Sequence, residues 1–339
     1  MQGELDKRIK NNVVVDDYSV IAPFPRNMLL EVTNICNDAC IFCANPKTSR
    51  KKKMMDFAFG KKIMKDAYEQ GTREVGFYST GEPLVNTELE KYIAYAKQIG
   101  YEYVYITTNG ALLDRRRSES ILNAGIDSVK FSVNASNAKD YLLVHGRDDF
   151  TCVKNNIFAF DQERKRVPKK VNLFISCVKT KYTLNIEDEF CSLFQSVADD
   201  IVFLKCNNEG GYMPEINEKL TIDGKGAYQA ENNVCPIFFK NLYVTVEGYL
   251  TMCCTDFQNY LAVADLNKEH IKDAWNNMHA QKLREAHLTH QLDGLLCFNC
   301  LYNTKKKVRP LVEAYAVPFD YLAYDLTDVI ERRIMSWDQ

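Results

Sequence analysis

One stretch, NMLLEVTNICNDACIFC from Asn27 to Cys43, sets the architecture expected of the whole chain. It begins as an apolar run typical of a buried strand, and Cys36, Cys40 and Cys43 follow in the loop after that strand. Three soft thiolates on a short loop can bind three irons of a [4Fe-4S] cubane and leave the fourth iron open. Zinc is the alternative metal, but a structural zinc site prefers four protein ligands and no paired histidine stands nearby in the sequence.

Further apolar or β-branched runs follow at intervals, with apolar residues at helical spacing between them. Strands are expected over residues 27–33, 73–79, 101–106, 127–134, 171–178 and 200–205, and helices over residues 57–69, 89–99, 115–124, 152–164 and 186–197. This alternation favours a parallel sheet covered by helices, here an α/β fold of the partial (β/α)6 TIM-like barrel class. In such folds the chemistry gathers at the carboxyl ends of the strands.

The pattern changes after residue 205. Residues 207–226 are rich in Gly, Asn and charged side chains, residues 241–252 alternate around Glu247-Gly248 as in a hairpin, and residues 269–290 have helical spacing. We therefore expect an N-terminal extension (1–26), a partial barrel (27–220), a small α+β iron–sulfur domain (221–305) and a C-terminal tail that is helical at its end (306–339).

The composition is that of a globular protein without a strong charge bias. Of 339 residues, 46% are hydrophobic, and 43 Lys and Arg stand against 45 Asp and Glu. The basic runs are short, so no nucleic-acid partner is expected. Charges are spread through the N-terminal residues, and no stretch approaches the roughly eighteen apolar residues of a membrane span, so no membrane partner is expected either. These features predict a soluble, cytoplasmic protein.

Eight of the twelve cysteines lie in two groups. In a reduced intracellular environment, a tight pair such as Cys297-Phe-Asn-Cys300 favours metal binding over a disulfide. Together with Cys235 and Cys253, this pair supplies four thiolates, which can close a second cluster completely or hold zinc. Cys254, next to Cys253, is expected to be a small buried residue; a spare thiol that donates a hydrogen atom is the alternative.

The spacing of Cys36, Cys40 and Cys43, with an aromatic residue before the last cysteine, resembles the signature of the radical S-adenosylmethionine (SAM) superfamily. The resemblance implies a SAM-cleaving [4Fe-4S] cluster on these cysteines. It also implies that Gly81-Glu82-Pro83, after the second strand, receives the SAM amino group, since a carboxylate and exposed carbonyls can accept hydrogen bonds from an ammonium. An ordinary turn is the other interpretation of this tripeptide.

By the same resemblance, polar residues at later strand ends contact the SAM carboxylate or ribose, namely Ser132, Asn134 and Ser176. Arg147 is the candidate for the carboxylate because a planar guanidinium matches that group. The alternatives are strand-end capping by Ser132 and Asn134, and a surface ion pair between Arg147 and a neighbouring aspartate.

The second cysteine group resembles the SPASM and shortened twitch domains of the same superfamily. A full SPASM domain would continue with further cysteines, but none follows Cys300. The resemblance therefore implies one auxiliary [4Fe-4S] cluster, held by Cys235, Cys253, Cys297 and Cys300.

The resemblance implies an enzyme that reductively cleaves SAM to a 5′-deoxyadenosyl radical, which abstracts a hydrogen atom from a substrate. Oxidation or epimerisation of a small polar substrate such as a sugar, nucleoside or aminocyclitol is expected first, because the auxiliary domain is short and only 26 residues precede the first strand. Modification of a peptide or protein side chain is the alternative, and a non-catalytic zinc-binding protein is a remote one. The expected electron donor is of the flavodoxin or ferredoxin kind.

Overall fold

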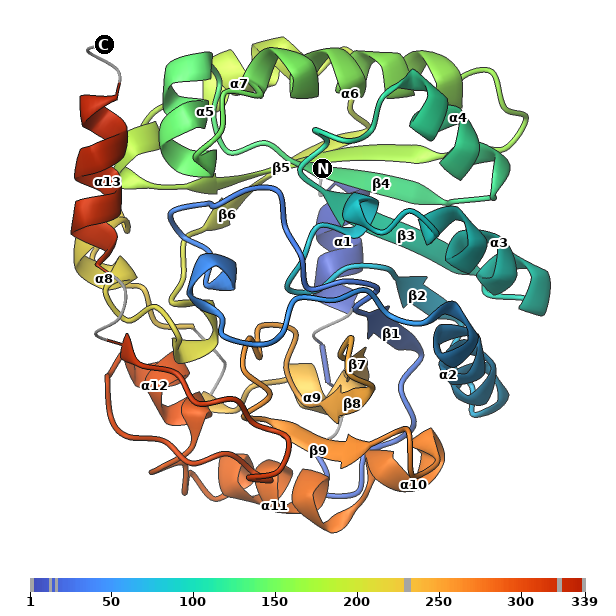
Figure 1. Cartoon of the computed structure of the whole chain (residues 1–339), viewed down its shortest axis with the longest axis vertical. Helices are drawn as coiled ribbons and strands as arrows, with labels where there is room; N and C mark the ends of the chain where they lie inside the picture. The colour runs from blue at the N-terminus through green and yellow to red at the C-terminus, as the bar shows by residue number, and fades with distance from the viewer. Residues whose placement is uncertain (1–2, 12–13, 16–17, 229–232, 322–324, 337–339) are drawn as a thin grey trace.

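A single curved sheet forms the centre of the computed structural model, which describes residues 3–11, 14–15, 18–228, 233–321 and 325–336 (Figure 1). Its strand order is β6-β5-β4-β3-β2-β1-β7-β8-β9. Neighbours from β6 to β7 are parallel, whereas β8 and β9 are antiparallel. The strands are β1 (Asn27–Leu30), β2 (Glu74–Gly76), β3 (Tyr103–Thr108), β4 (Ser128–Ser132), β5 (Asn172–Lys179), β6 (Asp200–Lys205), β7 (Asn241–Val244), β8 (Tyr249–Thr251) and β9 (Ala262–Asp265).

Helices cover the outer face of this sheet (Figure 1). All five helices expected between the first six strands are present, as α2, α3, α4, α6 and α7. Across the described residues, no helix combines the length and the apolar character needed to span a bilayer. The helices are α1 (Glu4–Asn11), α2 (Phe57–Glu69), α3 (Leu89–Ile99), α4 (Arg115–Asn123), α5 (Ala138–His145), α6 (Phe150–Arg164), α7 (Glu187–Phe194), α8 (Ile216–Lys219), α9 (Ile237–Lys240), α10 (Ile271–Trp275), α11 (Met278–Leu288), α12 (Leu296–Tyr302) and α13 (Leu326–Met335).

Side chains of strand β4 alternate between the outer face of the sheet and the interior of the barrel. Val129 and Phe131 are fully buried on the outer face, where the Phe131 ring packs against Phe160 of α6 with centroids 5.8 Å apart. Ser128 and Lys130 point the other way and line a cavity inside the barrel. The expected barrel is therefore confirmed, and it is partial because β6 and β9 end the sheet without pairing to each other.

The expected hairpin is present as β7 and β8, but it belongs to the barrel sheet. β7 pairs in parallel with β1, in a register that sets Met28 opposite Leu242. The cysteine-bearing C-terminal region is thus attached to the strand that precedes the first cysteine group. The helix expected at the end of the chain is present as α13; residues 322–324 and 337–339 of the expected tail lie outside the described residues.

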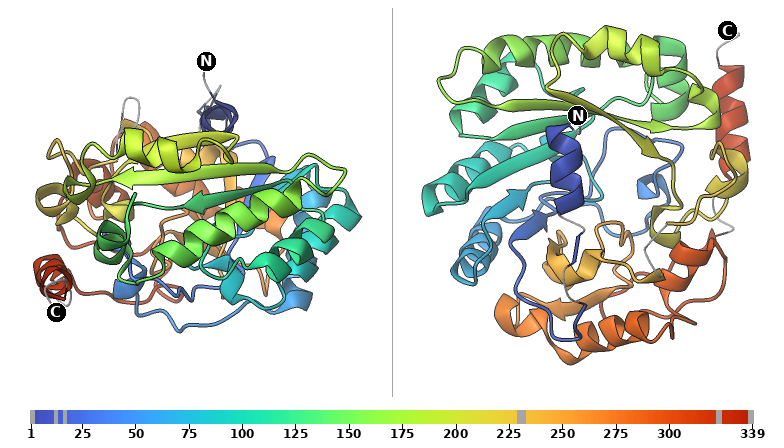
Figure 2. Two further views of the ribbon diagram at one scale, coloured as in Figure 1. Left: turned by 90° about the horizontal axis from the view of Figure 1, so that it is seen from above. Right: turned by 180° about the vertical axis from the view of Figure 1, so that it is seen from behind.

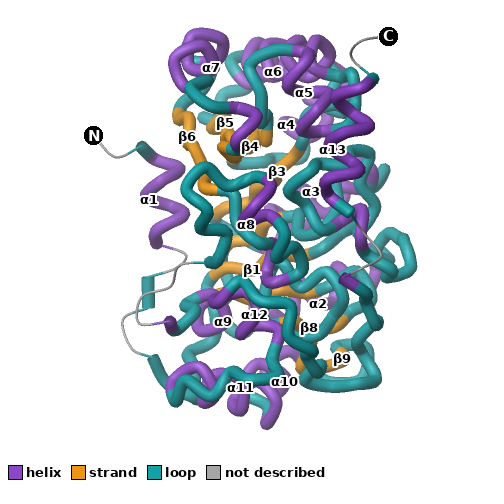
Figure 3. The backbone as a smooth tube through the Cα atoms, turned by 90° about the vertical axis from the view of Figure 1, so that its left-hand side faces the viewer, coloured by secondary structure: helices purple, strands orange, loops and turns teal. Residues whose placement is uncertain are grey.

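Helix α1, which the sequence analysis did not predict, lies across the amino-terminal ends of the barrel strands (Figures 2 and 3). The backbone N–H of Leu5 donates to Asp200 at 2.9 Å, and Arg8 pairs with Glu74. The Arg8 guanidinium also lies 3.4 Å from the centroid of the Tyr103 ring. These partners begin three different strands, so α1 forms the floor of the barrel.

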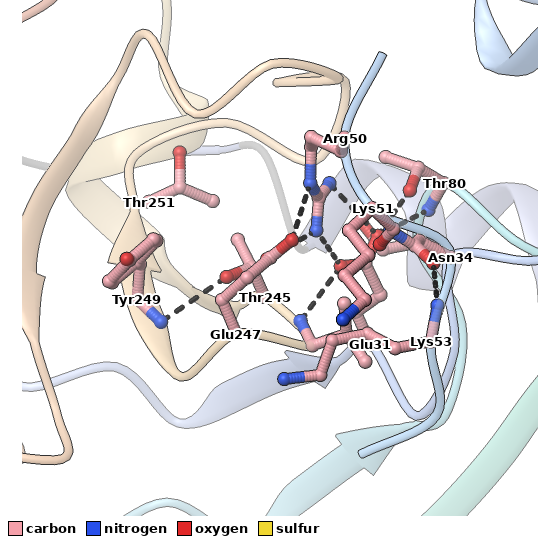
Figure 4. Close-up of polar contacts among 12 residues, drawn as sticks. Glu31, Asn34, Arg50, Lys51, Lys53, Thr80, Thr245, Glu247, Tyr249 and Thr251 are labelled. Atoms are coloured by element: carbon pink, nitrogen blue, oxygen red, sulfur yellow. Dashed lines mark hydrogen bonds and ion pairs between the residues drawn. The ribbon is translucent and has the colours of Figure 1, made fainter. Parts of the chain in front are cut away.

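A buried ion network joins the two halves of the molecule (Figure 4). Arg50, in the loop after β1, lies 2.5 Å from the Glu31 carboxylate and 2.6 Å from the Glu247 carboxylate. Glu31 also accepts hydrogen bonds from the Val246 backbone N–H and the Thr80 hydroxyl. Because Glu247 sits in the turn between β7 and β8, one guanidinium fixes the cysteine loop to the C-terminal hairpin.

Replacing Arg50 by Met should destabilise the protein by about 3–5 kcal/mol, because the Glu31 carboxylate would stay buried without its counter-charge. Chemical denaturation measures the change. The control is Lys62→Met, which removes an exposed pair with Asp66 and should cost at most about 1 kcal/mol. Equal effects of the two variants would contradict a structural role for the network.

Candidate functional site

The first cysteine group lies in the long loop after β1, which crosses the carboxyl end of the barrel (Figure 1). Backbone hydrogen bonds fix this loop to the end of α5: Ala39 N–H donates to the His145 carbonyl at 3.0 Å, and Ile41 N–H to the Val144 carbonyl at 2.9 Å. The Asn45 side chain donates to the Thr80 carbonyl at 2.6 Å and so ties the loop to the segment after β2. The loop is therefore held by the segments that follow two strands of the barrel, β4 and β2.

The three thiols of this loop form one buried group. Burial, followed by the nearby Glu82 carboxylate, raises the pKa of Cys36 to about 12. Burial also raises the pKa of Cys40 and of Cys43 far above the usual range, and the neighbouring cysteines add to both shifts. Thiolates at these positions therefore require a strongly cationic partner, which iron supplies. Two backbone N–H groups, each 3.4 Å from the sulfur of Cys36 or Cys43, suit anionic sulfur.

A histidine that the sequence analysis did not consider lies beside Cys40. The His145 Nδ1 atom is 2.8 Å from the Asp38 carboxylate and 3.5 Å from the Cys40 sulfur. Its Nε2 atom accepts from the Asn134 backbone N–H at 3.3 Å, so Nδ1 carries the proton and points at Asp38 and Cys40. Tyr141 stacks on the ring, with centroids 4.0 Å apart. Because both ring nitrogens are engaged, His145 orients the loop.

The Gly81-Glu82-Pro83 segment packs directly on the cysteine loop. A Cβ atom on Gly81 would lie 2.4 Å from the Thr33 carbonyl, so only glycine fits, and Glu82 N–H donates to the Ile35 carbonyl at 2.8 Å. The Glu82 carboxylate accepts from the backbone N–H groups of Leu84 and Asn109 and from the Thr108 hydroxyl. Burial nevertheless raises its pKa to about 7. Both carboxylate oxygens are thus already used within the protein, and contact with a SAM amino group stays a prediction.

The structure brings together three of the four other residues predicted to contact SAM. Ser132 and Ser176 are direct neighbours in the register of β4 and β5. Asn134 follows β4, and its side-chain oxygen accepts from the Val178 backbone N–H at 2.8 Å. Arg147, in contrast, is half exposed and pairs with Asp149 at 2.9 Å. This is the surface ion pair that the sequence analysis gave as the alternative to a SAM contact.

The second cysteine group lines a cavity of about 130 Å³. Cys297 and Cys300 come from α12, Cys235 precedes α9 and Cys253 follows β8. Burial, with a contribution from Cys253, raises the pKa of Cys235 to about 12 and raises the pKa values of Cys297 and Cys300 further. A cavity of this size holds a compact group of several heavy atoms, and four convergent thiols fit a fully ligated iron–sulfur cluster.

Cys253 and Cys254 both line this cavity but differ in their surroundings. Hydrogen bonding from Cys254 lowers the pKa of the Cys253 thiol, and the Thr255 hydroxyl lies 3.2 Å from its sulfur. The same hydrogen bond raises the pKa of Cys254. The Cys254 sulfur in turn raises the pKa values of Lys130 and Tyr78 of the barrel by its charge. Cys254 is therefore the one of the two thiols that also acts on barrel residues, and Cys253 as the cluster ligand stays a prediction.

Glu209 is another residue that the sequence analysis missed. Burial, followed by Cys253, raises the pKa of its carboxyl group to about 8. The same carboxylate raises the pKa of Cys43, so it is in electrostatic reach of both cysteine groups. Its only sequence signal is the Glu-Gly-Gly turn, which is common to many loops.

Family models match more than half of the chain. The model of the radical SAM superfamily matches residues 30–178, and the SPASM iron–sulfur cluster-binding domain matches residues 235–301. The chain therefore belongs to the radical SAM superfamily and carries a C-terminal SPASM domain. These domains bring a SAM-cleaving [4Fe-4S] cluster, SAM and an auxiliary iron–sulfur site, which the two buried cysteine groups fit.

A curated relative matches part of the chain. The PqqA peptide cyclase of Gluconobacter oxydans (strain 621H) is 32% identical over 109 residues, which cover 32% of this chain and 30% of that relative. The chain thus matches less than a third of that relative's length.

Several solved structures share the fold. BtrN in complex with AdoMet and 2-DOIA has a TM-score of 0.56 at 18% identity, covering 88% of this chain and 100% of that chain. Streptococcus suis SuiB bound to precursor peptide SuiA has a TM-score of 0.61 at 14% identity, and the match covers 82% of this chain and 69% of SuiB. The AdoMet-bound anSMEcpe has a TM-score of 0.61 at 14% identity, and the match covers 92% of this chain and 93% of anSMEcpe.

Matched cysteine variants test the two ligand sets. Two four-iron clusters require about eight irons per chain, and replacing Cys36, Cys40 and Cys43 together by Ala should leave about four. Cys253→Ser should also leave about four, whereas Cys254→Ser should keep about eight. Iron analysis after anaerobic reconstitution measures these contents. Loss of iron in Cys254→Ser but not in Cys253→Ser would reverse the ligand assignment.

His145→Phe tests the orienting role of the histidine. Phenylalanine keeps the stacking on Tyr141 but leaves the buried Asp38 carboxylate without its donor, so we expect the cysteine loop to lose order and the iron content to fall from about eight to about four. His279→Phe on α11 is the control and should keep the full iron content. A fully loaded His145→Phe protein would show that the ring does not hold the loop.

Proposed function

We propose that this radical SAM enzyme abstracts a hydrogen atom from a peptide or protein side chain that binds in the barrel between the two cysteine groups. One observation supports a substrate site shared by the two groups: Gly210, next to Glu209, lines the cavity of the second cysteine group, and the Glu209 carboxylate also raises the pKa of Cys43 in the first group. A substrate beside Glu209 is therefore close to both groups. When bound, the cluster and SAM supply the electron and the radical that no side chain can generate.

The peptide class of substrate rests on the relatives. The curated match is a peptide cyclase, and two of the similar proteins have also been solved with a peptide: SuiB with its precursor peptide, and anSMEcpe, in a further structure, with the peptide Kp18Cys. The sequence analysis favoured a small polar substrate, so the relatives support its alternative better than its first choice.

A small polar substrate remains the second candidate, on one observation. The BtrN structure in complex with 2-DOIA is matched over its full length, by 88% of this chain. Oxidation, epimerisation and cross-linking are all compatible with hydrogen-atom abstraction, and Cys254 offers a thiol that lines the cavity of the second cysteine group.

The chain's own residues provide the environment for this chemistry. The floor helix α1 covers the amino-terminal end of the barrel and the loop after β1 crosses its carboxyl end, so both border the space in which the substrate would react. The raised pKa of Glu209 keeps its carboxyl group protonated in part near neutral pH, where it can exchange a proton with the substrate.

The test is substrate-stimulated SAM cleavage by the anaerobically reconstituted enzyme. Short peptides encoded beside the gene should increase 5′-deoxyadenosine formation and become modified, and the triple Cys36, Cys40 and Cys43 to Ala variant should show neither effect. Stimulation by sugars, nucleosides or aminocyclitols, with none by peptides, would contradict the peptide proposal and support the second candidate.

A further inference from the structure

One lysine side chain lies inside the barrel. Lys130 occupies the middle of β4, on the face opposite to the buried Val129 and Phe131. It lines a cavity of about 70 Å³ above the floor helix, together with the hydroxyl-bearing side chains of Tyr78, Thr107 and Ser128. Lys130 is of intermediate exposure and lines this cavity, so the residue is not sealed in the hydrophobic core.

No acidic side chain neutralises Lys130 among the residues that the structure describes. The residues that line the cavity include no Asp or Glu, and Arg8, the other cation of the lining, already pairs with Glu74. The Cys254 thiol is the one acidic group that raises the lysine pKa. The Arg8–Glu74 pair is neutral overall, and the cavity therefore carries one uncompensated positive charge when Lys130 is protonated.

An unpaired ammonium in this position destabilises the folded protein. Burial lowers the pKa of Lys130 to about 8, because the charged form loses its hydration without gaining a counter-charge. An apolar residue of similar volume at this position is expected to leave the stability of the fold unchanged or to increase it, so the fold does not require the lysine. The side chain is thus better explained by something that binds in the barrel.

We propose that the Lys130 ammonium binds a carboxylate group of the substrate inside the barrel. The inference rests on the proposed function, in that the carboxylate belongs to an acidic side chain of the peptide. Tyr78, Thr107 and Ser128 supply hydroxyl groups around the same cavity, and these can donate further hydrogen bonds to a carboxylate. An aliphatic or cationic side chain would leave the lysine charge unpaired and should bind more weakly.

The experiment measures binding to the reconstituted, SAM-loaded enzyme by anaerobic calorimetry. The probes are N-acetyl-glutamic acid α-amide, its neutral analogue N-acetyl-glutamine α-amide, and free glutarate. The variants are Lys130→Met and, as the control, Lys272→Met, which removes the same charge from an exposed position on α10. The glutamate probe should bind the wild type and Lys272→Met alike and Lys130→Met at least about thirtyfold more weakly.

Lys130→Met should fold, and its melting temperature without probe should exceed that of the wild type. A lower melting temperature would show that the ammonium already has a partner in the protein and would overturn the proposal. Equal binding of the glutamate and glutamine probes to the wild type, or unchanged binding of the glutamate probe to Lys130→Met, would also overturn it.

The outcomes separate this inference from the proposed function. If glutarate binds in a Lys130-dependent manner and the blocked glutamate does not, the carboxylate site stands and the peptide side chain as its source is rejected. If peptides stimulate SAM cleavage equally in the wild type and in Lys130→Met, the proposed function stands and the role of Lys130 is rejected.

Discussion

Burial of three thiols side by side is the constraint on which the rest of this structure depends, because the nearby cations Lys52 and Arg333 offset it only in part. In the protein alone, Cys36, Cys40 and Cys43 are held where their ionised forms are strongly disfavoured. A bound iron cluster removes this penalty, and it can do so only if the loop keeps all three sulfurs in place. The surrounding residues are best understood as the means of holding that loop.

Several unrelated segments contribute to this task. His145 from α5, Asn45 of the loop itself and the Arg50 network each fix a different part of the loop. Through Glu247, the Arg50 network also fixes the hairpin that precedes Cys253, and Thr48 adds hydrogen bonds from the same loop to Phe257 and Gln258. The barrel sheet continues into the C-terminal region for the same reason, because β7 lies beside β1.

Local sequence patterns predicted much of the architecture, because strands and helices of a parallel barrel leave clear periodicities. They also predicted both cysteine groups, since the ligand types and spacings are visible in the chain. They did not predict the roles of His145, Glu209 or Lys130, because these depend on partners distant in sequence: the His145 ring meets Asp38 from 107 positions away. The floor helix α1 was missed for a similar reason, since its partners begin strands far along the chain.

The central claim is that SAM binds at an iron which no side chain of the protein ligates. The most direct test is electron paramagnetic resonance of the reduced N-terminal cluster, recorded with and without SAM in a protein whose auxiliary ligands Cys297 and Cys300 are replaced by Ala. The account predicts that SAM changes the spectrum, because it enters the coordination of the open iron. An identical spectrum with and without SAM, or a site that holds only zinc, would contradict the account.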